Sequence, residues 1–162
     1  MIVLDTHVLV WTLQDDSKLG SKARTLIDDQ IHDAVLVPAI SIWEIALLVE
    51  KGRIGLGTDI GKWVTQALDL PGVVLAPLEP SISIDSVMLP GSFHEDPADR
   101  LILATARYHE APLLTADRAI LEYADAGHVH AIDASLKSPH PNAPCSHQLR
   151  SPVRGSVLSP RR

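Results

Sequence analysis

The stretch IVLDTHVLVW, residues 2–11, decides the fold. It opens with the apolar run IVL, which stops at Asp5. A short, uniformly apolar run is typical of a parallel strand that is buried on both faces. The apolar positions after Asp5 follow helical spacing instead. The stretch therefore predicts a strand that passes through an acidic residue directly into a helix.

The same alternation of strand and helix continues along the chain. Further strands are expected at residues 34–37, 73–75, 112–115 and 128–132. Helices are expected at residues 6–13, 21–32, 41–52, 58–70, 81–89, 97–108 and 117–123. Ser41 is the expected N-cap of the third helix, and Gly52 is expected to end it. Because the connections are short, we predict an α/β fold with a central parallel sheet of about five strands and helices on both faces.

The size and composition of the chain favour a single globular domain. A length of 162 residues suits one sizeable core. No apolar run approaches the roughly 20 residues of a membrane helix, and the N-terminus lacks the basic and long apolar segments of a signal peptide. We therefore expect a cytoplasmic protein with no membrane partner. The single cysteine, Cys145, cannot form a disulfide within the chain.

Residues 135–162 differ from the rest of the chain. They contain five prolines and no periodic apolar face, a composition that cannot bury enough surface to offset the entropy of ordering. We therefore expect a domain over residues 1–134, followed by a disordered, basic tail rich in Pro and Ser.

The charge is unevenly distributed between these two parts. The tail carries five Lys/Arg and no acid, whereas residues 1–134 carry nine Lys/Arg and all 20 Asp/Glu, a net charge of −11. An acidic body attracts polyanions poorly, because phosphate attraction normally comes from Lys and Arg. Any nucleic acid must therefore be held by bound cations or by a local basic patch.

Four acidic residues fall where strands end or helices begin. Asp5 and Asp117 each follow a predicted strand, and Glu44 and Asp99 each lie in about the first turn of a predicted helix. In open parallel sheets, sites form beyond the carboxyl ends of the strands, where the strand order reverses. We therefore expect these four side chains to converge at one edge of the sheet.

Four converging carboxylates repel one another unless a cation neutralises them. Hard oxygen ligands favour Mg²⁺ or Mn²⁺, and such an ion can polarise a phosphodiester and lower the pKa of a bound water. Each acid alone has a simpler explanation, because Asp often caps a helix; capping alone would account for Asp96 and Asp117. The joint pattern is what favours a metal site acting on RNA or DNA.

The segments that carry these acids together resemble the PIN domain, specifically the toxin subunit of VapBC-type toxin–antitoxin pairs. They are IVLDTHVLVW with Asp5, SIWEIA with Glu44, HEDPADRLILATA with Asp99 and LLTAD with Asp117. The resemblance covers nearly all of residues 1–134 and keeps the family's order and approximate spacing. It implies a PIN-like α/β/α sandwich.

The resemblance also implies a function. The protein would be a Mg²⁺-dependent endoribonuclease, with Mn²⁺ as an alternative ion, that cuts RNA through a metal-activated water and acts as the toxin of a type II toxin–antitoxin system. The implied catalytic and metal-binding residues are Asp5, Glu44, Asp99 and Asp117. Thr6, Ser41 and Thr115 would orient the carboxylates and water. A small DNA-binding antitoxin would be the partner, and the toxin would form a homodimer.

Three other functions compete with this interpretation. A magnesium-dependent phosphatase would use Asp5 as a nucleophile, but it usually needs a second acid two residues later, where this chain has His7. A phosphate-receiver module needs a lysine after a late strand, where this chain has Thr-Ala-Asp-Arg at residues 115–118. A PIN module that binds RNA or a partner without cutting would not need all four acids.

Three residues near Asp99 carry weaker signals. We interpret His94 as a loop residue, Asp96 as a helix cap and Arg100 as a structural partner of the acids. Whether His94 or Asp96 takes part in the site is left open by the sequence.

The three tryptophans are interpreted as core or interface residues. They are Trp11, Trp43 and Trp63.

Overall fold

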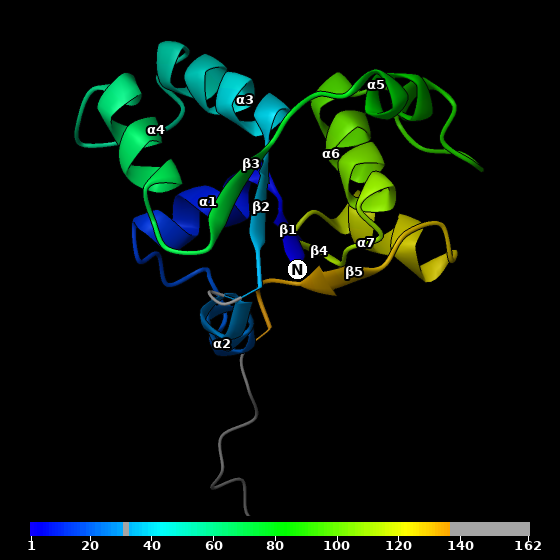
Figure 1. Cartoon of the computed structure of the whole chain (residues 1–162), viewed down its shortest axis with the longest axis horizontal. Helices are drawn as coiled ribbons and strands as arrows, with labels where there is room; N and C mark the ends of the chain where they lie inside the picture. Colours follow the sequence, from blue (N-terminus) through cyan, green and yellow to red (C-terminus); the bar gives the residue numbers. More distant parts are fainter. Residues whose placement is uncertain (31–32, 137–162) are drawn as a thin grey trace, which may run out of the picture.

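The computed structural model describes residues 1–30 and 33–136 and shows a parallel sheet between two layers of helices (Figure 1). The strands are β1 (Ile2–Leu4), β2 (Val35–Pro38), β3 (Val73–Ala76), β4 (Leu113–Thr115) and β5 (Ala131–Asp133). They pair in the order β3-β2-β1-β4-β5, and every pair is parallel. The predicted sheet is confirmed.

The helices are α1 (Thr6–Leu13), α2 (Ser21–Asp29), α3 (Ala39–Glu50), α4 (Ile60–Leu68), α5 (Pro80–Val87), α6 (Pro97–Tyr108) and α7 (Arg118–Asp125). Local sequence explains several of their ends. Asp59, Asp96 and Asp117 accept hydrogen bonds from backbone N–H groups at the starts of α4, α6 and α7. Gly52, with a φ of +66°, follows the end of α3. Within the described ranges, no helix is both long enough and apolar enough to cross a membrane.

The sheet is covered on both faces, as predicted. Alternate residues of the central strands point to two separate cores. On one face, Ile2, Leu4 and Leu114 pack with α1, α2 and α4. On the other, Val3 and Leu113 pack with α6 and α7. Because both faces are buried, these strands are apolar at every position rather than at every second one.

The chain reverses its direction across the sheet beside β1. From β1 it moves outward to β2 and β3, and the segment through α5 and α6 then returns it to β4, on the other side of β1 (Figure 1). Ligands of open α/β sheets bind at such a reversal, beyond the carboxyl ends of the strands. Asp5 and Asp117 follow β1 and β4, so both stand at this reversal.

Some boundaries differ from the expectation. Ser41 is not the N-cap of α3: the helix begins at Ala39 with Pro38 as its N-cap, and Ser41 is buried inside it. The fixed φ of proline lets Pro38 both end β2 and precede the helix directly. The helix therefore starts before Ser41, whose hydroxyl was the expected cap. Glu44 consequently lies in the second turn. β5 begins at Ala131, not at His128.

Two parts of the sequence interpretation cannot be compared with the structure. The expected continuation of α2 through residues 31–32 lies outside the described residues. The expected tail lies outside them from residue 137 onward. The domain boundary at residue 134 stays a prediction.

Candidate active site

Asp5 follows β1 directly and is almost fully buried, with 3% of its surface exposed. It is the N-cap of α1, but its side chain makes no hydrogen bond to that helix. Instead, the Thr115 hydroxyl at the end of β4 donates to Asp5 Oδ2 at 2.5 Å. Burial raises the pKa of Asp5, and Glu44 raises it further, while Thr115 and His7 lower it. The Asp5 carboxylate is therefore available to a ligand rather than to its own helix.

Glu44 is held in place from α1. The Thr6 hydroxyl donates a hydrogen bond to Glu44 Oε2 at 2.6 Å, which links the start of α1 to α3. Ser41 lies three residues before Glu44, so both side chains share one face of α3. Ser41 is fully buried, and its hydroxyl has no hydrogen-bond partner among the described residues.

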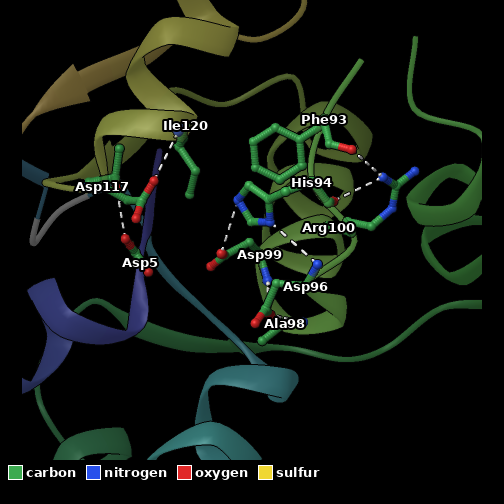
Figure 2. Close-up of polar contacts among 10 residues, drawn as sticks. Asp5, Phe93, His94, Asp96, Ala98, Asp99, Arg100, Asp117 and Ile120 are labelled. Carbon is green, nitrogen blue, oxygen red and sulfur yellow. Dashed lines mark hydrogen bonds and ion pairs between the residues drawn. The ribbon is translucent and has the colours of Figure 1, made fainter. Parts of the chain in front are cut away.

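The start of α6 separates the roles of its two aspartates. Asp96 is the cap: its Oδ1 accepts from the N–H groups of Ala98 at 2.9 Å and Asp99 at 3.4 Å. The Asp99 carboxylate is left free of capping and faces the ring of His94, with Oδ2 lying 3.4 Å from His94 Nε2 (Figure 2). The other ring nitrogen, His94 Nδ1, lies 3.3 Å from the N–H of Asp96 and accepts from it.

Asp117 combines a capping bond with a place beside Asp5. Its Oδ1 accepts from the N–H of Ile120 at 3.0 Å, while its own N–H donates to Thr115 Oγ1 at 2.9 Å (Figure 2). Thr115 is fully buried and thus connects Asp117 to Asp5. One carboxylate oxygen of Asp117 serves the cap, which leaves the second for a ligand.

The electrostatics of Asp99 fit the predicted grouping of the four acids. Burial raises the pKa of Asp99 from 3.8 to about 7, and repulsion from Asp5, Asp96, Asp117 and Glu44 adds to that rise. A nearby like charge disfavours the ionised form of a carboxylate and so raises its pKa. The three other predicted acids, together with Asp96, therefore lie near enough to Asp99 to act on its charge.

The chemistry of this donor set suits a divalent cation. Among residues 1–30 and 33–136, no three His, Cys, Asp or Glu side chains lie close enough to hold one ion directly. Mg²⁺, however, usually keeps several waters and takes only one or two carboxylates. The mutual repulsion at Asp99 and the unpartnered hydroxyl of Ser41 both fit a hydrated cation at this position. Ligation by all four acids stays a prediction.

Two residues near Asp99 have different roles, one structural and one in contact with the site. Arg100 is structural, but its partners differ from the acids that the sequence suggested. Its guanidinium donates to the carbonyl oxygens of Ser86, Val87, Phe93 and His94. His94 is more than a loop residue, since it contacts Asp99. Nothing in the motif spacing indicates that contact, because it depends on how the loop before α6 turns.

Two of the three tryptophans belong to or pack on the core, and an interface at the third, Trp43, stays a prediction. Trp63 is in the core, with 5% of its surface exposed, and Trp11 packs against the same core. Trp43 is 55% exposed on α3.

Comparison with known proteins identifies the family of the chain. Residues 2–126 match the family described as "PIN domain". The chain is 38% identical over 119 residues to "Ribonuclease VapC22" of Mycobacterium tuberculosis, a match that covers 74% of this chain and 88% of that protein.

The fold also resembles solved structures. FitAcB from Neisseria gonorrhoeae superposes with a TM-score of 0.58 at 22% identity, covering 83% of this chain and 98% of that one. VapBC2 from Rickettsia felis, bound to a DNA fragment from its promoter, superposes with a TM-score of 0.57 at 15% identity, covering 82% and 98%. At these identities the likeness concerns the fold, and it includes the parallel sheet with helices on both faces.

Proposed function

The chain belongs to the PIN domain family, and from this membership we propose that it is a divalent-metal-dependent ribonuclease and the toxin of a type II toxin–antitoxin pair. The observation that carries the proposal is the link of Asp5 to Asp117 through Thr115, together with the repulsion that Asp5, Asp117 and Glu44 exert on Asp99. The 38% identity to a mycobacterial ribonuclease supports RNA as the substrate.

The site residues divide into those that would hold the cation and those that hold the ligands in place. Asp5, Asp99, Asp117 and Glu44 supply the oxygens. When bound, Mg²⁺ or Mn²⁺ would polarise the phosphodiester and lower the pKa of an attacking water.

The hydroxyls keep this site preorganised. Thr115 holds Asp5 at 2.5 Å and Thr6 holds Glu44 at 2.6 Å, so two of the four carboxylates are oriented before any ligand arrives. Ser41 offers a third buried hydroxyl on the Glu44 face of α3.

Metal removal and one matched pair of variants test the activity. RNA cleavage by the purified protein should stop in EDTA and return with Mg²⁺ or Mn²⁺. Glu44→Gln should reduce cleavage at least about a hundredfold, in line with the loss of an electrostatic group at a reacting centre. Glu50→Gln changes an exposed glutamate of the same helix and should cleave normally. Full activity in EDTA would contradict the mechanism, and metal-dependent RNA binding without cleavage would identify a non-catalytic PIN module.

Two protein partners belong to the same proposal. One solved structure with this fold is a toxin–antitoxin complex from Klebsiella pneumoniae, and VapBC2 is bound to DNA from its promoter. We therefore propose a small DNA-binding antitoxin encoded beside this chain. A second copy of the chain is proposed for the face of α5, where Ile84, Val87 and Met88 are 61%, 77% and 72% exposed. Apolar patches of this kind mark interaction surfaces. A cytoplasmic location is proposed with them.

Two measurements test these partners. Light scattering should give twice the mass of the chain for the wild type and the monomer mass for Val87→Asp. Co-expression with the product of the open reading frame immediately upstream should inhibit RNA cleavage. A monomeric wild type would contradict the homodimer without affecting the nuclease proposal.

A further inference from the structure

Phosphate attraction gives the domain of residues 1–134 little hold on RNA. Residues 1–134 carry a net charge of −11, and the site itself is made of carboxylates, so a bound cation must offset repulsion before it contributes attraction. If the chain binds RNA, as proposed above, a substantial part of its affinity must come from contacts with something other than phosphate. The remaining parts of a nucleotide are the ribose and the base.

A cavity lies directly beside the acidic site, between the loop before α6 and helix α7. Its volume is about 330 Å³, and its walls include Ser92, Phe93, His94, Ala119 and Tyr123. It adjoins the site at two points. His94 forms one wall and contacts Asp99 at 3.4 Å, and Ala119 lies two residues after Asp117 on α7. A group bound in the cavity would therefore sit next to a phosphate bound at the acids.

The cavity is bordered by a continuous row of aromatic rings. The Phe93 and His94 ring centroids are 4.0 Å apart, those of Phe93 and Tyr123 are 5.0 Å apart, and those of Tyr123 and His128 are 4.7 Å apart. Tyr123 is buried, with 5% of its surface exposed, and its hydroxyl donates to the Pro90 carbonyl at 2.6 Å, so it supports the Phe93 ring from within the core. Successive rings of this kind are the platform on which proteins stack bases.

His94 can offer a ligand only one face of its ring, because the Phe93 ring covers the other, with centroids 4.0 Å apart. Its Nδ1 accepts from the N–H of Asp96 and its Nε2 faces Asp99, so both polar edges are engaged within the protein (Figure 2). The side chain is nevertheless 38% exposed. A partly exposed ring whose edges are occupied is suited to stacking rather than to hydrogen bonding.

The charged group of the cavity favours a base over a phosphate. Glu122 lines the wall, and its carboxylate pairs with the exposed Arg118 at 3.0 Å. A carboxylate repels a phosphate but accepts hydrogen bonds from the amino groups of a base. The cavity thus combines aromatic ring faces, on which a base can stack, with a carboxylate that can accept hydrogen bonds from that base.

We propose that this cavity binds a nucleobase of the RNA substrate, the one next to the phosphodiester that is cut. The proposal rests on the proposed function, because it places the base relative to the phosphate held at the acids. It assigns base stacking to Phe93 and His94 and base discrimination to Glu122.

Binding of mononucleotides tests the proposal without any cleavage. The four nucleoside 5′-monophosphates and ribose 5-phosphate, which lacks a base, are titrated into the full chain with Mg²⁺ by calorimetry. At least one nucleotide should bind about tenfold more tightly than ribose 5-phosphate, since base–aromatic stacking contributes on that scale. Ala119→Leu fills the cavity and should remove this advantage. Ala124→Leu changes an alanine of the same helix that does not line the cavity and should keep it.

Ring signals in NMR spectra give a readout that does not depend on the variants folding. The preferred nucleotide should shift the Phe93, Tyr123 and His128 ring resonances of the wild type, and ribose 5-phosphate should not. Equal affinity for nucleotide and ribose 5-phosphate, or unshifted rings, would overturn the cavity assignment even if RNA is cut. Nucleotide binding in the cavity without RNA cleavage would instead overturn the proposed function and leave the base site standing.

Discussion

The Asp99 carboxylate is held in an environment that disfavours its own charge. Its pKa is about 7 against an ordinary value of 3.8, first because it is buried and then because it lies near other carboxylates. Between these two pH values the folded protein keeps a proton that the unfolded chain loses. Stability therefore falls as the pH rises from about 4 to 7 in the metal-free protein. A cation that binds the acids removes this cost, which couples the fold to the metal.

Replacing Asp99 by Asn should make an inactive but more stable protein. The substitution removes one charge and keeps the side-chain shape, so in EDTA at pH 7 we expect an increase of about 1 kcal/mol or more in the free energy of unfolding. Thermal melts in EDTA at pH 7 and pH 4.5 measure it. The advantage should shrink at pH 4.5, where wild-type Asp99 is protonated in the folded state.

Addition of Mg²⁺ provides the control for this experiment. It should raise the Tm of the wild type by mass action and that of Asp99→Asn much less. If Asp99→Asn is instead less stable in EDTA and both proteins respond equally to Mg²⁺, Asp99 is a structural residue and the cation binds elsewhere.

At the scale of the element, the two aspartates at the start of α6 have different roles. Asp96 stabilises the helix by accepting from backbone N–H groups at 2.9 Å and 3.4 Å. Because Asp96 accepts hydrogen bonds from the N–H groups at the start of the helix, the Asp99 carboxylate is not needed as a cap and can face the site. The division explains how adjacent acids of one motif can have unrelated roles.

Removal of the cap should therefore affect stability and not chemistry. Asp96→Ala should lower the free energy of unfolding by about 1 kcal/mol and change RNA cleavage by only a few-fold. Asp96→Asn keeps a capping oxygen and should be nearly as stable as the wild type. Urea unfolding at pH 5 and cleavage assays separate the two quantities. Loss of cleavage in Asp96→Asn, with Asp99→Asn still active, would mean that the roles are reversed.

Sequence patterns predicted the elements well and the contacts less well. The strand cores were predictable because runs such as Ile2–Leu4 are apolar throughout, as strands buried on both faces require. The start of α3 was not, because Pro38 begins the helix before the more usual capping signal of Ser41. The contact of His94 with Asp99 was not predictable either, since it depends on the path of the loop rather than on any spacing.

At the scale of the whole molecule, the last described residues pack against the loop before α2. Gly20 N–H donates to the Ala134 carbonyl at 2.8 Å, and a Cβ on Gly20 would lie only 2.1 Å from the Leu136 carbonyl oxygen. Only glycine allows this approach. Residues up to Leu136 therefore contribute to packing around the start of α2.

A chain that ends at Leu136 should fold as stably as the full chain. The 26 residues removed, 137–162, lie outside the described structure and have no periodic apolar face. We expect an unchanged Tm in scanning calorimetry. RNA binding should become weaker and less dependent on salt, because all five tail cations are lost. A lower Tm would show that the tail packs on the domain, and a chain that ends at Gly127 provides the destabilised reference because it lacks β5.

The hydrogen bond between Thr115 and Asp5 joins residues 110 positions apart, which sets when the active site can first form during synthesis of the protein. Domains form on the ribosome as their residues emerge, with the N-terminal part first. Here β1 emerges early, but its neighbour β4 and the carboxylate of Asp117 are among the last parts of the domain to leave the exit tunnel. A nascent chain bearing Asp5, Glu44 and even Asp99 therefore cannot assemble the site. Nuclease activity therefore cannot appear until translation of the domain is nearly finished.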